Sequence, residues 1–295
     1  MNSVPEPALK RCLLDLQSRL SAREIQLVLG GGYGLFLKQI DLMTRDEMTL
    51  LSVEAWPTPR TTNDLDLIVP LELLVDLENM QMVRSVLDDL QFQSISGSEF
   101  WQFILPSSNV KIDLLAGAIP KYAESQLKMD SSDNRRVRPK GNIKLHARRN
   151  PEALGLAQHQ EGVIVQGNLS DGSNYSGTIH IPSPFTYLMM KLTAFGDQVN
   201  NGEKDFGRHH ALDVYRIVSM LTDDQYDVTR HQFNENGHEA PVQHVIKLTE
   251  TMFDSNTSAG IVRLREHVFF GANMDIRAFI GGLQGLIKLD QTLLT

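Results

Sequence analysis

Residues 63–69, which read NDLDLIV, constrain the fold more than any other segment of the chain. Successive side chains of a β-strand point to opposite faces of a sheet. The apolar residues at odd positions therefore share one face, whereas Asp64 and Asp66 share the other. The pattern predicts a strand that is buried on one side and carries two carboxylates on the other.

Residues 110–115, VKIDLL, repeat this alternation, with Asp113 opposite the apolar positions. If both strands bury their apolar faces on one core, then Asp113 shares the face of Asp64 and Asp66, although the distances depend on the register. Aspartate is depleted in strands, and like charges placed opposite one another cost about 0.2–1 kcal/mol per pair. Bound Mg²⁺ would offset this cost, because it prefers carboxylate oxygens together with water and phosphate. A half-exposed strand whose aspartates face water is the alternative interpretation.

A glycine turn precedes these strands. The apolar residues 26–29 predict a short strand that ends at Gly30, Gly31 and Gly32, and a helix is expected over residues 33–43. The turn fits neither a G-x-G-x-x-G pattern nor a P-loop. The free N–H groups of a helix N-terminus can nevertheless hold a triphosphate, although a tight turn without a ligand fits equally well.

The chain divides by pattern near residues 182–184 into a mixed α/β part and a helical part, so we expect domains at 1–183 and 184–295. The fold class expected is α+β, a mixed sheet flanked by helices and followed by an α-helical domain. Residues 41–59 predict a loop or flap. Further strands are expected at 100–105, 163–166 and 178–181, and helices at 7–23, 71–90, 185–199, 210–221, 242–253, 261–269 and 276–289.

Charge and composition exclude several classes of protein. A formal charge of −8 over 295 residues excludes a uniformly basic surface, and the single Cys12 cannot form an intramolecular disulfide. Residues 1–10 lack a signal-peptide pattern and no window is apolar enough to span a membrane, so a cytoplasmic protein is expected. Residues 135–149 hold seven cations and no acidic residue. Subtracting these seven positive charges from the net −8 leaves a formal charge of −15 on the rest of the chain. This stretch is either a solvated loop or an RNA backbone contact.

The order of these motifs resembles the polymerase-β-type nucleotidyltransferase superfamily, whose pattern is a glycine turn, Asp-x-Asp and a third strand carboxylate. Within it the chain is similar to the abortive-infection (AbiEii/AbiGii-like) nucleotidyltransferases, many of them toxins of toxin–antitoxin pairs. The similarity continues through HIPSPF at 180–185, KLTA at 191–194, KDF at 204–206 and DVY at 213–215. It covers roughly residues 25–216. The chain departs from the family pattern in two places. Gly32 and Asp64 are 32 residues apart, which makes residues 41–59 an insertion over the site, and the run from Asp205 to Asp213 is longer than usual.

The resemblance implies transfer of a nucleoside monophosphate from an NTP to an acceptor hydroxyl. Asp64 and Asp66 would hold one or two Mg²⁺ ions, and Asp113 would complete the metal site and help to deprotonate or orient the acceptor. Lys191 would neutralise the triphosphate. The expected nucleotide-binding residues are Gly31, Gly32, Arg60, Thr62 and Asp205, where Asp205 would orient Lys191 by an ion pair or merely begin a helix.

Three functions remain open from the sequence. The first is a toxin-like enzyme that modifies RNA, for example a tRNA end, through residues 135–149, with an antitoxin protein as a further partner. The second is transfer to a small molecule such as an aminoglycoside, or to a protein, and the strongly acidic remainder of the chain suits a cationic acceptor. The third is a catalytically silent, nucleotide-binding member of the fold.

Overall fold

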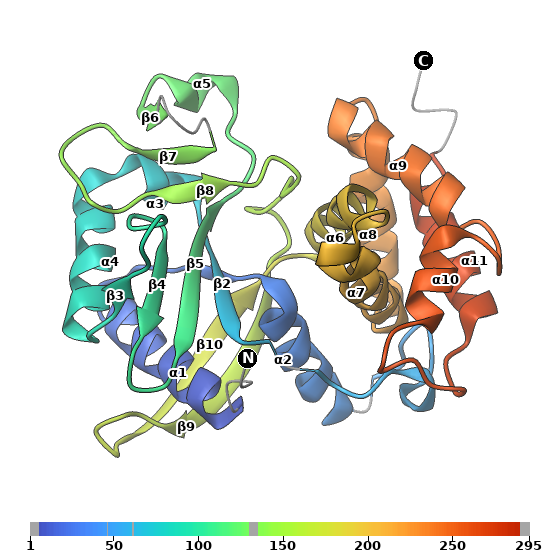
Figure 1. Cartoon of the computed structure of the whole chain (residues 1–295), viewed down its shortest axis with the longest axis horizontal. Helices are drawn as coiled ribbons and strands as arrows, with labels where there is room; N and C mark the ends of the chain where they lie inside the picture. Colours follow the sequence, from blue (N-terminus) through green and yellow to red (C-terminus); the bar gives the residue numbers. More distant parts are fainter. Residues whose placement is uncertain (1–5, 46, 61, 130–134, 290–295) are drawn as a thin grey trace. The chain divides into compact units, whose positions relative to one another are not determined.

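The computed structural model describes residues 6–45, 47–60, 62–129 and 135–289 (Figure 1). Thr61 of the aspartate motif and residues 1–5, which bear on the signal-peptide expectation, lie outside the described residues. The chain divides into two compact units, Met1–Leu37 with Arg60–Pro182, and Lys38–Pro59 with Ser183–Thr295. The helical part thus contains a segment from before the aspartate motif. That residues 1–183 and 184–295 are two domains, each able to fold on its own, remains a prediction.

The first unit is built on a mixed sheet. Its described strands form one ten-stranded sheet with the order β6-β7-β8-β5-β2-β1-β10-β9, and β3 and β4 extend from the β5 edge. The strands are β1 (Val28–Leu29), β2 (Asp64–Val69), β3 (Gln93–Ser94), β4 (Gln102–Leu105), β5 (Val110–Ala116), β6 (Leu127–Met129), β7 (Arg136–Pro139), β8 (Ala147–Arg149), β9 (Glu161–Asn168) and β10 (Asn174–Ile181).

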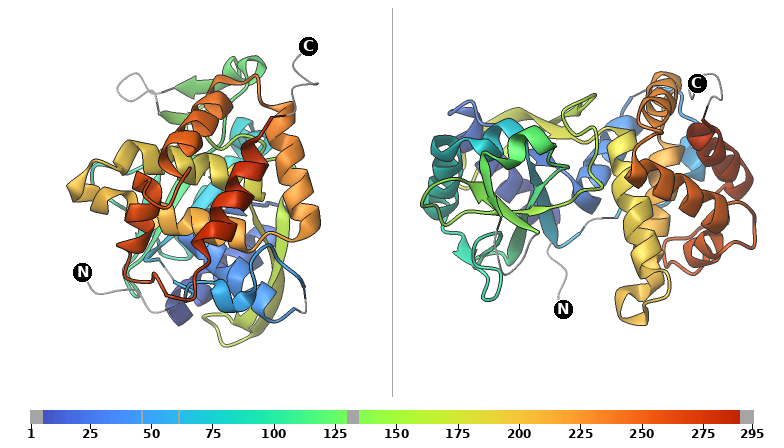
Figure 2. Two further views of the ribbon diagram at one scale, coloured as in Figure 1. Left: turned by 90° about the vertical axis from the view of Figure 1, so that its right-hand side faces the viewer. Right: turned by 90° about the horizontal axis from the view of Figure 1, so that it is seen from above.

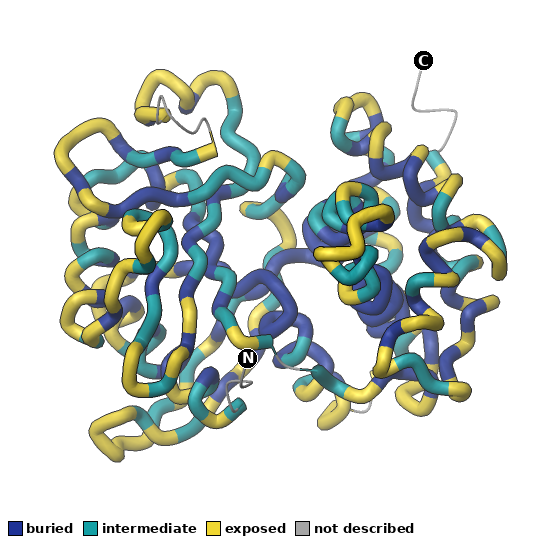
Figure 3. Tube along the Cα trace, viewed as in Figure 1, coloured by how far each residue is buried: buried dark blue, intermediate teal, exposed yellow. Residues whose placement is uncertain are grey.

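Helices cover the apolar face of this sheet. Leu65, Leu67, Ile112 and Leu114 are at most 3% exposed. Helix α1 (Glu6–Ser21) contacts β2, β5, β9, β10 and α4 (Leu77–Asp89). The Arg84 guanidinium of α4 lies 5.1 Å from the Phe103 ring, which faces the same side as Ile112. Along β5 the buried residues alternate with half-buried or exposed ones, and the buried stretches of the sheet are dark blue in Figure 3.

The second unit is helical, as expected. Its described residues form the later part of α2 (Gly31–Met43), α6 (Pro184–Gln198), α7 (Arg208–Ser219), α8 (Asp223–Glu235), α9 (Ala240–Met252), α10 (Ala259–Arg265) and α11 (Ile276–Ile287), with the short 3₁₀ segments η1 (Val53–Ala55) and η2 (Gly202–Gly207). Figure 2 shows these helices crossing one another. Most residues of α6 and α7 are buried. Ser183 caps α6 by accepting the Thr186 N–H, and Pro184 follows at the first helical position.

Three sequence expectations need correction. The helix expected over 71–90 is two helices, α3 (Leu71–Val75) and α4, because the Asp76 side chain accepts the Asn79 N–H and starts a new helix. Helix α8 was not predicted; Thr222 and Gln225 form a capping box at its start. The basic stretch is no simple loop, since it contains β7 and β8.

The segment expected to be a flap is anchored within the second unit. The Leu50 and Leu51 N–H groups donate to the Leu221 and Ser219 carbonyls, and the Trp56 side chain is buried. The Tyr215 hydroxyl donates to the Ala55 carbonyl at 2.9 Å. These contacts explain why residues 38–59 belong to this unit. No helix in the described part of the chain is both long and apolar enough to cross a membrane.

Candidate metal and nucleotide site

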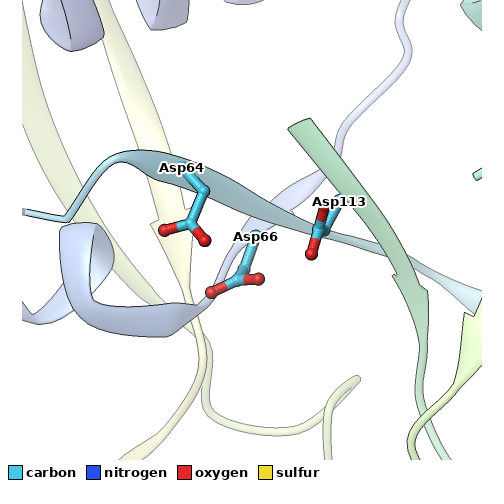
Figure 4. A group of neighbouring side chains, drawn as sticks. All are labelled: Asp64, Asp66 and Asp113. Atoms are coloured by element: carbon cyan, nitrogen blue, oxygen red, sulfur yellow. The ribbon is translucent and has the colours of Figure 1, made fainter. Parts of the chain in front are cut away.

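The three predicted carboxylates meet on one face of the sheet. Strands β2 and β5 are parallel, and their register places Asp66 directly opposite Asp113. One carboxylate oxygen each from Asp64, Asp66 and Asp113 lie within 4.8 Å of one another, and all three residues are half-buried (Figure 4). The register left open by the sequence is therefore the one that joins the three side chains.

The charge on this cluster is costly without a cation. Burial raises the pKa of the Asp113 carboxyl above its ordinary value, and the charge of Asp64 raises it further. A hydrogen bond from Gln102 and the positive charges of Lys111 and Arg148 act in the opposite direction. Three half-buried carboxylates at this distance form a set of hard oxygen donors of the kind that Mg²⁺ prefers. The residues present thus fit a divalent cation.

The glycine turn lies against the same carboxylates. The Gly30 N–H donates to the Asp66 carbonyl at 2.8 Å, which ties the turn to β2. Gly31 begins α2 with φ +62°, and a Cβ there would lie 1.9 Å from Asp66 Oδ2. A Cβ on Gly32 would lie 2.3 Å from the Thr62 side chain and 3.7 Å from the Arg60 guanidinium. Four of the predicted nucleotide-binding residues thus surround the helix N-terminus beside Asp66.

Gly31→Ala tests how closely this turn approaches the site. We expect a loss of about 1–2 kcal/mol of unfolding free energy from the left-handed backbone alone, together with weaker Mn²⁺ binding, because the new Cβ must displace the Asp66 carboxylate. Gly97→Ala is the matched control: its φ is +84°, but a Cβ there meets no atom of the described residues within 4 Å. Calorimetric titration with Mn²⁺ and urea unfolding measure both effects. Equal Mn²⁺ affinity in the two variants would contradict the close approach.

Lys191 and Asp205 lie in the second unit and do not pair with each other, so the ion pair, one of the two roles expected for Asp205, is not formed. Lys191 is on α6, and its Nζ lies 2.8 Å from Asp213 Oδ2 on α7. Asp205 instead pairs with Arg208 at 2.7 Å. The ion-pair partner of Lys191 is thus Asp213, because α6 and α7 pack against each other and bring these side chains together. Asp213 also accepts from Arg216 at 3.2 Å and is 1% exposed.

Cations continue the carboxylate face of the sheet toward one edge. Leu115, two residues after Asp113, pairs with Arg148 of β8, so both point to the carboxylate face. Arg148 pairs in turn with Arg136 of β7. The Arg148 guanidinium also lies 5.1 Å from the centre of the Trp101 ring.

The same register carries the row to the last strand at this edge. Arg138 follows Arg136 on the same face and pairs with Lys128 of β6. Arg149, although part of the basic run, points to the opposite face, where its guanidinium contacts the Met129 sulfur. The cation row on the carboxylate face is Arg148, Arg136, Arg138 and Lys128.

Sequence reasoning missed one polar neighbour of the site, Gln102. Its amide Nε2 donates to Asp113 Oδ1 at 2.9 Å. The signal was present in the strands expected at 100–105 and 110–115. If the four residues 106–109 between them form a hairpin loop, residue 105 pairs with 110 and residue 102 with 113. The structure has this register.

Comparisons with other proteins add little to this geometry. No family model matches the chain. No curated protein matches it. Among solved structures, the chain is similar to the antibiotic-resistance factor ANT(2'')-Ia, at 10% identity over 81% of this chain and 98% of that chain, with a TM-score of 0.36. Fold and site therefore define a mixed-sheet protein in which three carboxylates that could hold a cation lie beside a helix N-terminus. This class rests on the strand register and the side chains of this chain.

Proposed function

We propose that this chain is a metal-dependent nucleotidyltransferase of the polymerase-β type, which transfers a nucleoside monophosphate from an NTP to an acceptor hydroxyl. The observation that carries the proposal is the convergence of Asp64, Asp66 and Asp113 beside the glycine turn. Carboxylates alone would suit many cation sites. A helix N-terminus against one of them adds a place for phosphate oxygens, because its N–H groups and positive dipole end favour anions.

The residues divide the work of transfer between them. The acceptor oxygen forms a bond to the α-phosphorus while the bond to the bridging oxygen breaks, and pyrophosphate leaves with that electron pair. The chemistry that bound Mg²⁺ would supply is neutralisation of charge at the attacking and leaving oxygens. We assign orientation and deprotonation of the acceptor hydroxyl to Asp113, which stands directly opposite Asp66 across β2 and β5. Gly31 and Gly32 offer backbone N–H groups to the triphosphate.

For the acceptor we propose RNA, and the cation row supports this choice. Four cations in register on β8, β7 and β6 extend from the carboxylate face. Phosphates are the groups that such a row neutralises well. An aminoglycoside is cationic and would be repelled by the row. Transfer to a small molecule or a protein, and a silent nucleotide-binding protein, are the alternatives that the assay below distinguishes.

The proposal is tested by incubating the protein with labelled NTPs, Mg²⁺ and either total RNA or an aminoglycoside. We expect label in RNA. Lys128→Gln should lower the slope of log K for RNA against log salt by about 1, since each phosphate contact releases counterions. Lys144→Gln, an exposed cation of the same run outside the row, is the control. Label in the aminoglycoside alone would overturn the choice of acceptor, and NTP binding without any transfer would leave the silent alternative.

Several finer statements rest on the sequence resemblance alone. These are membership of the AbiEii/AbiGii-like group, a tRNA end as acceptor, a toxic activity with an antitoxin partner, and a role for Lys191 toward the triphosphate. Asp205 as an element of the nucleotide site has no support from its contacts, because its carboxylate pairs with Arg208. We retain the other four as part of the proposal.

A further inference from the structure

Gln102 faces the carboxylate site from the side opposite to Asp66. In the sheet, β5 has β2 on one edge and β4 on the other, and Asp66, Asp113 and Gln102 stand in one row across the three strands. The side chains of such a row share a face. Gln102 is half-buried, and its Nε2 lies 2.9 Å from Asp113 Oδ1.

The direction of this hydrogen bond follows from the chemistry of the partners. An ionised carboxylate only accepts, so the amide nitrogen of Gln102 must face Asp113. The bond occupies one lone pair of Oδ1 and restricts rotation of the carboxylate. Removing a group that orients a metal ligand in this way typically lowers the metal affinity by about 10–100-fold.

We propose that Gln102 is a positioning residue for the cation site: it holds the Asp113 carboxylate in the orientation in which one oxygen meets those of Asp64 and Asp66. Gln102 acts through Asp113 and contacts no reacting atom. The inference rests on the proposed function in taking the triad as a cation site. It goes beyond that function by assigning the site a fourth, uncharged member from β4.

Gln102→Met tests this inference, because methionine keeps the length of the side chain and removes the amide. Mn²⁺ affinity, measured by calorimetric titration of the full chain without nucleotide, is expected to fall about 10-fold. Gln102→His, whose ring N–H can donate to the same oxygen, should retain most of the affinity. Gln93→Met makes the same chemical change at an exposed position of the neighbouring β3 and should leave Mn²⁺ affinity unchanged. In transfer assays, kcat should fall while KM for the NTP stays constant.

A Gln102→Met protein that has the stability of the wild type and binds Mn²⁺ as tightly would overturn the inference. A lower thermal midpoint with unchanged Mn²⁺ affinity would also overturn it, since that result describes a purely structural side chain. If Gln102→Met does not fold, the Mn²⁺ affinity of Gln102→His is compared with that of the wild type. A 10-fold loss of affinity in Gln102→His would overturn the role of residue 102 as a hydrogen-bond donor. Wild-type protein that binds no Mn²⁺ overturns the inference as well. Mn²⁺ binding that depends on Gln102 in a protein without transferase activity would support the inference while refuting the proposed function.

Discussion

Asp66→Asn is expected to abolish nucleotide transfer without harming the fold. The substitution removes one of three charges that meet within 4.8 Å. The transfer rate should fall by more than about 100-fold, because replacing a residue that only supports a metal ligand already costs up to about 100-fold. In metal-free buffer the thermal midpoint should equal or exceed that of the wild type, because one repulsive charge is gone, and each such pair is worth about 0.2–1 kcal/mol.

Metal addition separates this prediction from a simple packing effect. Mn²⁺ at 100 times its Kd should stabilise the wild type by about 2.7 kcal/mol, since only the folded protein has the site. It should leave Asp66→Asn almost unchanged. Asp89→Asn, the same substitution at an exposed position of α4, should behave as the wild type in every assay. A collapse of folding in metal-free Asp66→Asn would count against a metal role for this carboxylate.

Asp213→Ala is expected to cause the largest loss of stability among the changes considered. Asp213 is 1% exposed and accepts from Lys191 at 2.8 Å and from Arg216 at 3.2 Å. Alanine would leave both cations buried without this carboxylate. Removing one partner of a buried pair costs about 3–5 kcal/mol, because the remaining charge stays desolvated.

Urea unfolding measures this loss as a lower midpoint at constant slope. Asp197→Ala is the matched control, since Asp197 is an exposed aspartate of α6 in the same unit. Its effect should remain within about 0.5 kcal/mol. Equal midpoints for the two variants would show that the Lys191–Asp213 pair contributes no net stability.

Local patterns predicted the central strands well. The alternation in 63–69 and 110–115 predicted which side chains of β2 and β5 face the core, and the structure confirms the fold class, a mixed sheet flanked by helices with a helical part after it. Alternation with period two is a property of each strand by itself. For this reason it could be read without knowing the neighbours of the strand.

Short and charged elements were harder to predict. Strand β7 alternates arginine with Val137, whereas β8 reads ARR, and four and three residues are too few for a clear period. The segment 41–59 has mixed composition, and its position depends on hydrogen bonds to residues 219 and 221, far along the chain. The local sequence of residues 41–59 does not indicate hydrogen-bond partners this distant along the chain.

The identity of the charged neighbours was also beyond the local pattern. Asp205 is nearer in sequence to Lys191 than Asp213 is, yet it pairs with Arg208. The packing of α6 against α7 decides which carboxylate reaches the lysine, and sequence distance does not report that packing.

By itself the sequence determined that Asp64, Asp66 and Asp113 lie on the faces of their strands opposite the apolar side chains, because side-chain alternation is intrinsic to an extended backbone. Only the tertiary structure decided that Asp66 stands opposite Asp113, that Gln102 completes their row, and that Asp213 holds Lys191. Strand register and helix packing are set by the burial of apolar side chains distributed over the whole chain, so no single segment contains them.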